Sequence, residues 1–263
     1  MQIDTDLVPF LHLLGTGAAI SDPHRTTTML AVTDDQSPAR TLLVDCGGDA
    51  LQRLQQCGPS IESVDGLIVT HAHMDHVSGF PLLMEKVWLD GRDRALPVVG
   101  IEPALAQARR SWDAFEPVHR DWEGLPPIDW RTVEHEPGAA VWDESAWTVT
   151  AAPVPHGDTA NVGLRFEHGP TGRVLAYSCD TAGPAETVVD LADGADLLVH
   201  EANGGPSDNH STAAEAAQVA RRADVDRLVL VHLPPGDKSE ELHRARDIFP
   251  HTDLGEELGT YPL

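Results

Sequence analysis

The sequence predicts an α/β (α+β) fold of four layers, in which helices cover the outer faces of packed β-strands. Two observations support this prediction. Short apolar strands alternate with helical stretches in both halves of the chain. The 263 residues also contain no internal repeat, low-complexity tract or long linker. We therefore expect residues 1–263 to form a single domain with a substantial core.

The first half predicts strands separated by helices, with apolar runs for the strands and longer stretches for the helices. The strands are expected at 8–15, 27–32, 39–46, 64–70 and 96–100, and the helices at 49–57, 79–89 and 102–115. The rest of the segment 101–147 is expected to be irregular and to cover a cleft. It is rich in tryptophan, and we expect these rings to fill the core rather than to stack on a substrate.

The second half continues the rhythm of strand and helix. Strands are expected at 147–154, 161–168, 173–179, 195–201 and 227–232. An alanine-rich helix is expected at 213–223, with Ser211 or Thr212 as N-cap and Glu215 completing a capping box.

The composition indicates an acidic cytoplasmic protein. The formal net charge is −24, and Lys86 and Lys238 are the only lysines. Such a surface opposes nonspecific binding to nucleic acid and to anionic membranes. A cytosol of high salt concentration would explain the bias, and an ordinary acidic protein is the alternative. Three unpaired cysteines fit a reducing compartment. We expect no signal peptide, membrane span or membrane partner.

The strongest chemical signal is HAHMDH, directly after the strand at 64–70. His71 and His73 alternate along an extended segment, so both can face one metal ion. The following turn presents Asp75 and His76 to a second position. Imidazole and carboxylate groups suit zinc, and also manganese or iron.

Two metal ions need further ligands, and three candidates follow later strands. His156 ends TVTAAPVPH, Asp180 ends RVLAYSCD and His232 ends RLVLVH. Each alone would be an unremarkable loop residue. Together, at matching strand ends, they predict one convergent site.

These segments resemble the metallo-β-lactamase superfamily over nearly the whole chain. The order is LLVDCGG, THAHMDHVSGFP, His156, SCDTAG, HEAN, HSTAAEA and VHLPP. The resemblance implies an αββα sandwich with two divalent metal ions at one edge. It assigns one ion to His71, His73 and His156, the other to Asp75, His76 and His232, and both to a bridging Asp180. It also implies that Asp45 orients a ligand histidine.

Within the superfamily, GTGAAI, HEAN and the segment 210–232 resemble ribonuclease Z, and the segments 70–79 and 178–183 resemble a cyclic-phosphate phosphodiesterase. The resemblance implies that His210 assists catalysis beside the metals, and we expect Glu201 to orient it. Only 23 residues separate His156 from Asp180, which leaves no room for the tRNA-gripping arm of ribonuclease Z. The cysteine-rich zinc site of the phosphodiesterase is also missing.

The expected function is hydrolysis of a small or nucleotide-like phosphodiester through a metal-bridging hydroxide. Asp75 and His210 are the expected catalytic residues, with His210 protonating the leaving oxygen. The surface charge and the missing arm argue against tRNA as substrate. A carboxylic-ester, lactone or thioester hydrolase is the alternative enzyme, and a noncatalytic ligand-binding protein is the third interpretation. The sequence leaves a homodimer open.

Overall fold

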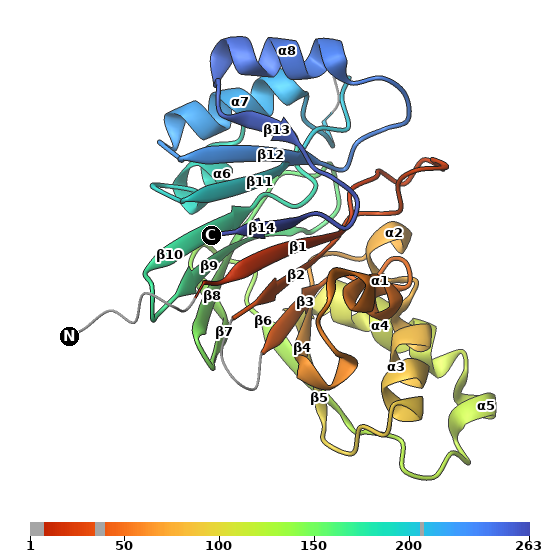
Figure 1. Cartoon of the computed structure of the whole chain (residues 1–263). Helices are drawn as coiled ribbons and strands as arrows, with labels where there is room; N and C mark the ends of the chain where they lie inside the picture. The colour runs from red at the N-terminus through yellow and green to blue at the C-terminus, as the bar shows by residue number, and fades with distance from the viewer. Residues whose placement is uncertain (1–7, 35–39, 206–207) are drawn as a thin grey trace.

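The computed structural model describes residues 8–34, 40–205 and 208–263. Two seven-stranded sheets pack face to face, and helices cover the outer face of each sheet (Figure 1). One continuous cluster of buried side chains draws residues from both sheets, and a second lies between the later sheet and its helices. The four-layer αββα sandwich expected from the sequence is therefore confirmed.

The first sheet has the strand order β14-β1-β2-β3-β4-β5-β6. Strands β1 to β3 pair antiparallel, and β3 to β6 pair parallel. The strands are β1 (Phe10–Gly15), β2 (Met29–Thr33), β3 (Thr41–Val44), β4 (Val64–Val69), β5 (Leu96–Ile101), β6 (Ile128–Val133) and β14 (Thr260–Pro262). The helices of this half are α1 (Ala50–Cys57), α2 (Met74–Val77), α3 (Phe80–Leu89), α4 (Glu102–Asp113) and α5 (Glu116–His119).

The second sheet has the order β13-β12-β11-β10-β9-β8-β7. Its strands β7 to β10 are antiparallel, and β10 to β13 are parallel. The strands are β7 (Ala139–Glu144), β8 (Trp147–Pro153), β9 (Val162–His168), β10 (Arg173–Tyr177), β11 (Leu197–Glu201), β12 (Arg227–Val231) and β13 (Thr252–Leu254). The helices are α6 (Glu186–Leu191), α7 (Ala213–Arg222) and α8 (Ser239–Ile248).

The central parallel strands are buried on both faces, as their continuous apolar sequences require. Every residue of β4 is buried. A Cβ added at Gly66 in this strand would lie 2.7 Å from the ring of Trp142 on the opposite sheet. The absence of a side chain at Gly66 therefore lets a large aromatic ring close the gap between the two sheets.

The predicted strands and helices are present with small shifts at their ends. Ala39, the first residue of the strand expected at 39–46, lies outside the described residues. Thr212, not Ser211, is the N-cap of α7, and it forms the expected capping box with Glu215.

The expectation of irregular structure after residue 115 was wrong in part. That segment contains β6 and β7, which are the edge strands of the two sheets. Both strands alternate buried and exposed residues only loosely, because an edge strand packs on fewer neighbours. The expectation for the tryptophans is confirmed where they are buried, at Trp112, Trp142 and Trp147.

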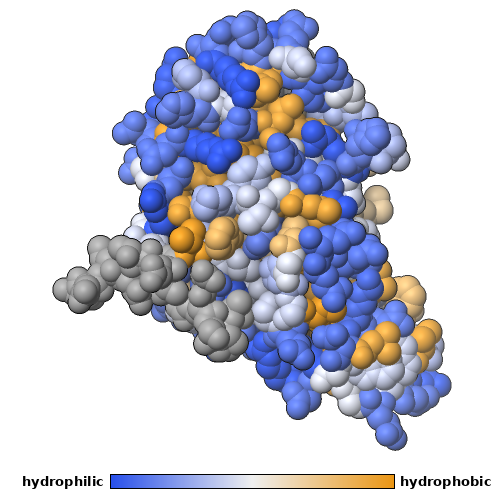
Figure 2. Space-filling view, viewed as in Figure 1, coloured by the Kyte–Doolittle hydropathy of each residue, from blue (hydrophilic) through white to orange (hydrophobic). Residues whose placement is uncertain are grey.

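The face seen in Figure 2 is mostly hydrophilic and carries small apolar patches, in keeping with the acidic composition. Among the helices described, none combines the length and the apolar character needed to cross a membrane.

Candidate metal centre

The predicted ligands meet at one edge of the sandwich because they follow the carboxyl ends of strands from both sheets. His71 to His76 follow β4, and His156 follows β8. Asp180 follows β10, and His232 directly follows β12. The carboxyl ends of parallel strands share one edge, which is the usual place for sites in α/β folds.

The side chains form two groups that share Asp180. The first group is His71, His73, His156 and Asp180, and the second is Asp75, His76, Asp180 and His232. Within each group the potential ligand atoms lie within 4.8 Å of one another.

Asp180 stands at the centre of both groups. Its Oδ2 lies 3.9 Å from His71 Nε2 and 3.4 Å from His76 Nε2. Its Oδ1 lies 3.2 Å from His232 Nδ1. Oδ2 thus lies near histidines of both groups and Oδ1 near the second, so this carboxylate could serve two cations at once.

Unpaired buried atoms show that these residues fit metal ions. His71 Nε2, His76 Nε2, His232 Nδ1 and Asp180 Oδ1 are buried and have no hydrogen-bond partner within the described part of the chain. A buried polar atom without a partner costs about 1–3 kcal/mol. Cations held by the two groups would pair these four atoms, and mixed nitrogen and oxygen donors suit zinc and similar ions.

In four of the five candidate ligand histidines, the ring nitrogen that would not bind a metal ion is held by a hydrogen bond. His76 Nδ1 donates to Asp45 Oδ2 at 2.7 Å, and His156 Nδ1 donates to the carbonyl of Asn209 at 2.6 Å. Asp45 thus contacts a candidate ligand histidine, as the resemblance implied. Such contacts fix the tautomer and aim the free nitrogen at the metal.

Two threonines complete this set, and the sequence reasoning missed both. Thr70 Oγ1 lies 3.1 Å from His71 Nδ1 and also donates to Asp45 Oδ2 at 2.9 Å. Thr159 Oγ1 lies 3.1 Å from His73 Nε2. The position of Thr70 directly before HAHMDH was a usable signal. Thr159 is 86 residues from His73 and gave none.

The backbone is strained at three points around the site. Asp45, Cys179 and His232 have φ values of 61°, 52° and 54°. Residues with side chains rarely adopt this left-handed region, at a cost of about 1–3 kcal/mol each. Each of the three lies just beyond a strand end, where the turn directs Asp45, Asp180 or His232 into the centre.

Burial and neighbouring charges set the protonation states. Burial lowers the pKa of His71 well below its usual value and that of His232 to about 4, so both rings are neutral and able to bind metal. Burial alone would raise the pKa of Asp180, but His232 and His76 outweigh it and hold that pKa well below its usual range. Burial alone would lower the pKa of His76, but the carboxylates of Asp180 and Asp45 outweigh burial and raise it. The surroundings of His76 therefore favour a positive charge.

His210 lies beside the two groups and is not a member of either. Its ring is 5.1 Å from that of His156 and 5.3 Å from that of His232. His210 Nδ1 donates to Glu201 Oε1 at 3.0 Å. Burial disfavours a charged His210 ring, but Glu201 outweighs burial and raises its pKa. The pair expected from the sequence is therefore in contact.

Glu201 is fully buried and strongly held. Its Oε1 accepts hydrogen bonds from the backbone N–H groups of Thr181 and Ser211, and its Oε2 accepts one from Asn203. Burial raises the pKa of Glu201, and the hydrogen bond from His210 opposes that rise. This carboxyl group is a fixed anchor for the His210 ring.

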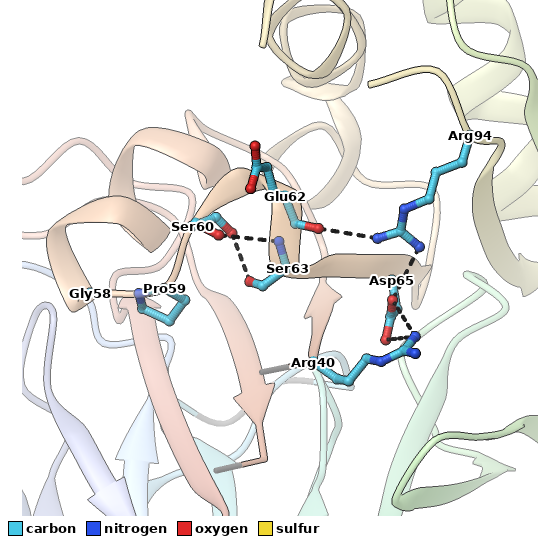
Figure 3. A pocket seen from close by; sticks show the side chains of 8 residues that line it. All are labelled: Arg40, Gly58, Pro59, Ser60, Glu62, Ser63, Asp65 and Arg94. Carbon is cyan, nitrogen blue, oxygen red and sulfur yellow. Dashed lines mark hydrogen bonds and ion pairs between the residues drawn. The ribbon is translucent and has the colours of Figure 1, made fainter. Parts of the chain in front are cut away.

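A pocket of about 540 Å³, shown in Figure 3, lies at the end of β4 opposite to the candidate metal centre. In its wall, the buried Asp65 accepts hydrogen bonds from Arg40 Nη1 at 3.1 Å and Arg94 Nη1 at 3.2 Å. At about 3.3 Å per residue, the strand places Asp65 about 20 Å from His71. The two arginines that line this pocket therefore pair with a buried carboxylate, which is a structural role.

Comparison with known proteins identifies the family. Residues 40–233 match the model of the β-lactamase superfamily domain. Ribonuclease Z from Methanothermobacter thermautotrophicus is 30% identical, with 94% of each chain covered. The metallo-β-lactamase-fold protein YhfI from Bacillus subtilis has a TM-score of 0.77 at 20% identity, covering 97% of this chain and 99% of that one. Human tRNase Z, short form, has a TM-score of 0.76 at 22% identity, covering 96% and 98%.

The name of the human protein states that it acts on tRNA, so the comparisons do not support the expectation that tRNA is an unlikely substrate. Family membership implies divalent metal ions, which agrees with the two candidate ligand groups. The chain therefore belongs to the metallo-β-lactamase superfamily and to its ribonuclease Z-like branch of metal-dependent hydrolases.

Proposed function

We propose that the chain is a phosphodiesterase with two metal ions. The observation that carries the proposal is the pair of ligand groups joined by Asp180, with the His210–Glu201 pair beside them. The first ion would be held by His71, His73, His156 and Asp180, and the second by Asp75, His76, His232 and Asp180. Such ions, zinc by the choice of donors, would activate water and neutralise charge on the phosphoryl oxygens.

The protein itself would supply positioning and proton transfer. Glu201 binds Nδ1 of His210, and Nε2 would then face the substrate. A protonated His210 could then donate to the leaving oxygen. The side chain of Asp75 is 14% exposed, whereas that of Asp180 is 2% exposed, so Asp75 is the ligand carboxylate best placed to take up a proton from solvent.

The substrate we propose is a small or nucleotide-like phosphodiester. The interval between His156 and Asp180 is filled by strands β9 and β10 and a short turn at 169–172, which favours a substrate that needs no arm. The net charge of −24 also opposes a long polyanion. Precursor tRNA is the second candidate, because the curated relatives carry the name Ribonuclease Z.

The test uses protein loaded with zinc or manganese and a panel of substrates. The panel contains an aryl phosphodiester, a dinucleotide, a precursor tRNA, a thioester and a lactone. We expect cleavage of the first two and its loss in Asp180→Ala. Specific removal of a tRNA 3′ trailer would establish the second candidate. Activity confined to the thioester or the lactone would refute the phosphodiesterase proposal.

A further inference from the structure

The hydroxyl group of Thr70 lies between candidate ligands of the two metal ions. Thr70 is fully buried, follows the last residue of β4 and directly precedes His71 of the first group. Among the described side chains, its Oγ1 contacts Asp45 Oδ2 at 2.9 Å, His71 Nδ1 at 3.1 Å and Cys179 Sγ at 3.1 Å. The function proposed above does not use this hydroxyl group.

The hydrogens available give each of these contacts a direction. A hydroxyl group has one hydrogen to donate and two lone pairs with which to accept. The Thr70 hydroxyl donates to the carboxylate of Asp45, and the thiol of Cys179 donates to the Thr70 oxygen. The neutral ring of His71 has a single N–H, which must lie on Nδ1 if Nε2 is to bind a metal ion, so Nδ1 donates to the Thr70 oxygen as well. Each capacity of the hydroxyl group is thus used once.

The carboxylate of Asp45 directly holds a candidate ligand of the second ion. Its Oδ2 accepts the Nδ1–H of His76 at 2.7 Å as well as the Thr70 hydroxyl, and its Oδ1 accepts the backbone N–H of Thr70 at 2.9 Å. All three residues are buried, so water does not compete for these hydrogen bonds. Asp45 and Thr70 therefore form one fixed unit behind the candidate ligands.

One carboxylate thus reaches a candidate ligand of each ion, His76 directly and His71 through the Thr70 hydroxyl. The rings of His71 and His76 lie 4.1 Å apart, and the Nε2 atom of each is buried without a hydrogen-bond partner in the described part of the chain. The charge on Asp45 polarises the Thr70 hydroxyl, which makes its oxygen a stronger acceptor for the N–H of His71. The orientation and the basicity of both rings therefore depend on the same carboxylate.

We propose that the Thr70 hydroxyl couples the two metal sites, because it extends the hold of Asp45 from His76 of the second group to His71 of the first. Thr70 is thereby a positioning residue for the first ion. This inference rests on the two-metal centre of the proposed function and goes beyond it. It makes the affinity for the first ion depend on a carboxylate whose direct contact is with a ligand of the second.

The test measures the affinity for one zinc ion at a time by competition with a chelator. Binding to the first group is measured in a His232→Ala background, and binding to the second group in a His156→Ala background. In the first background, Thr70→Val should weaken zinc binding by about 10–100-fold, and Thr70→Ser should restore it. Thr41→Val removes the hydroxyl of another fully buried threonine, on β3, and should leave the affinity unchanged.

Asp45→Asn tests the coupling itself through a double-mutant cycle. In the His232→Ala background it should weaken zinc binding, because an amide polarises the Thr70 hydroxyl less than a carboxylate does, and it should have little further effect once Thr70→Val is present. In the His156→Ala background it should weaken zinc binding with or without Thr70→Val. An effect on the first ion that is equal in both cases would overturn the coupling, as would an unchanged affinity in Thr70→Val.

The tautomer of His71 is a second readout, which needs neither metal nor a change at Thr70. In the metal-free wild type, nitrogen NMR of labelled histidines should find the proton of His71 on Nδ1, and a proton on Nε2 would refute the inference. Neither measurement uses a phosphodiester. If zinc binds with the expected coupling but no phosphodiester is cleaved, the proposed function fails and the coupling stands. If phosphodiesters are cleaved but the two substitutions act independently, the coupling alone is refuted.

Discussion

Replacing His210 with alanine should separate proton donation from metal binding. The ring of His210 contacts Glu201 and lies beside His156 and His232, but it belongs to neither ligand group. After the substitution, Glu201 keeps three backbone N–H donors, so its buried carboxyl group is not left unpaired. We therefore expect the free energy of unfolding to fall by about 1.5–3 kcal/mol, the value of one hydrogen bond to a charged group, and both metal ions to be retained.

The kinetic effect should depend on the leaving group. For an alkyl phosphodiester, whose leaving oxygen needs a proton, kcat should fall by about 10²–10⁴, or about 2.7–5.4 kcal/mol in activation free energy. For a nitrophenyl ester, whose leaving oxygen needs little protonation, the decrease should be much smaller. The assay measures kcat for both esters, with metal content determined by elemental analysis of the same samples.

A matched control is His243→Ala, which removes a histidine whose side chain is 78% exposed on α8. Its kcat and metal content should equal those of the wild type. If His210→Ala loses a metal ion, His210 is a ligand and the assignment of His232 is wrong. If it retains full activity on the alkyl ester, His210 is not the acid.

Four further predictions follow from the same structure. Elemental analysis of wild-type protein loaded with metal should find about two ions per chain, and Asp180→Ala should lose affinity for both. Thr159→Val should weaken metal binding by about 10–100-fold in a chelator competition, because His73 loses its orienting hydrogen bond, and Thr159→Ser should restore it. Burial lowers the pKa of His12 from 6.5 to about 4, so below pH 6.5 the unfolded chain takes up a proton first. The free energy of unfolding should therefore fall by up to about 3 kcal/mol more in the wild type than in His12→Gln between pH 6.5 and 4, and equal slopes would refute this. Potassium chloride at molar concentration should raise the melting temperature by screening a net charge of −24, and a flat or falling value would count against salt adaptation.

The sequence predicted that these side chains converge, because most of them are tied to strand ends. A buried strand followed by a polar residue is visible in the sequence at β4, β10 and β12, and parallel strands bring such ends together. The strand pattern alone therefore suffices to place His71, Asp180 and His232 at one edge. The metals they would bind followed from the types of side chain.

What the sequence did not predict depends on tertiary contacts. Thr159 matters only because the loop after β8 brings its hydroxyl to His73, and no local pattern marks it. Strands β6 and β7 were missed because an edge strand has one hydrogen-bonded neighbour and a partly exposed surface, so its apolar signal is weak.

The arrangement around Asp180 would also link metal binding to the stability of the folded chain. Of the described residues in left-handed conformations and the described buried polar atoms without partners, three residues and four atoms lie together in this one small region. Each of these features opposes folding when no cation is present. The strands on either side of the centre are buried on both faces. Their apolar side chains supply the stabilisation that offsets these unfavourable features. Metal binding would relieve the unpaired atoms, so its free energy adds directly to the stability of the folded chain. The candidate ligand groups are thus held in place by the rest of the fold, with His210 beside them.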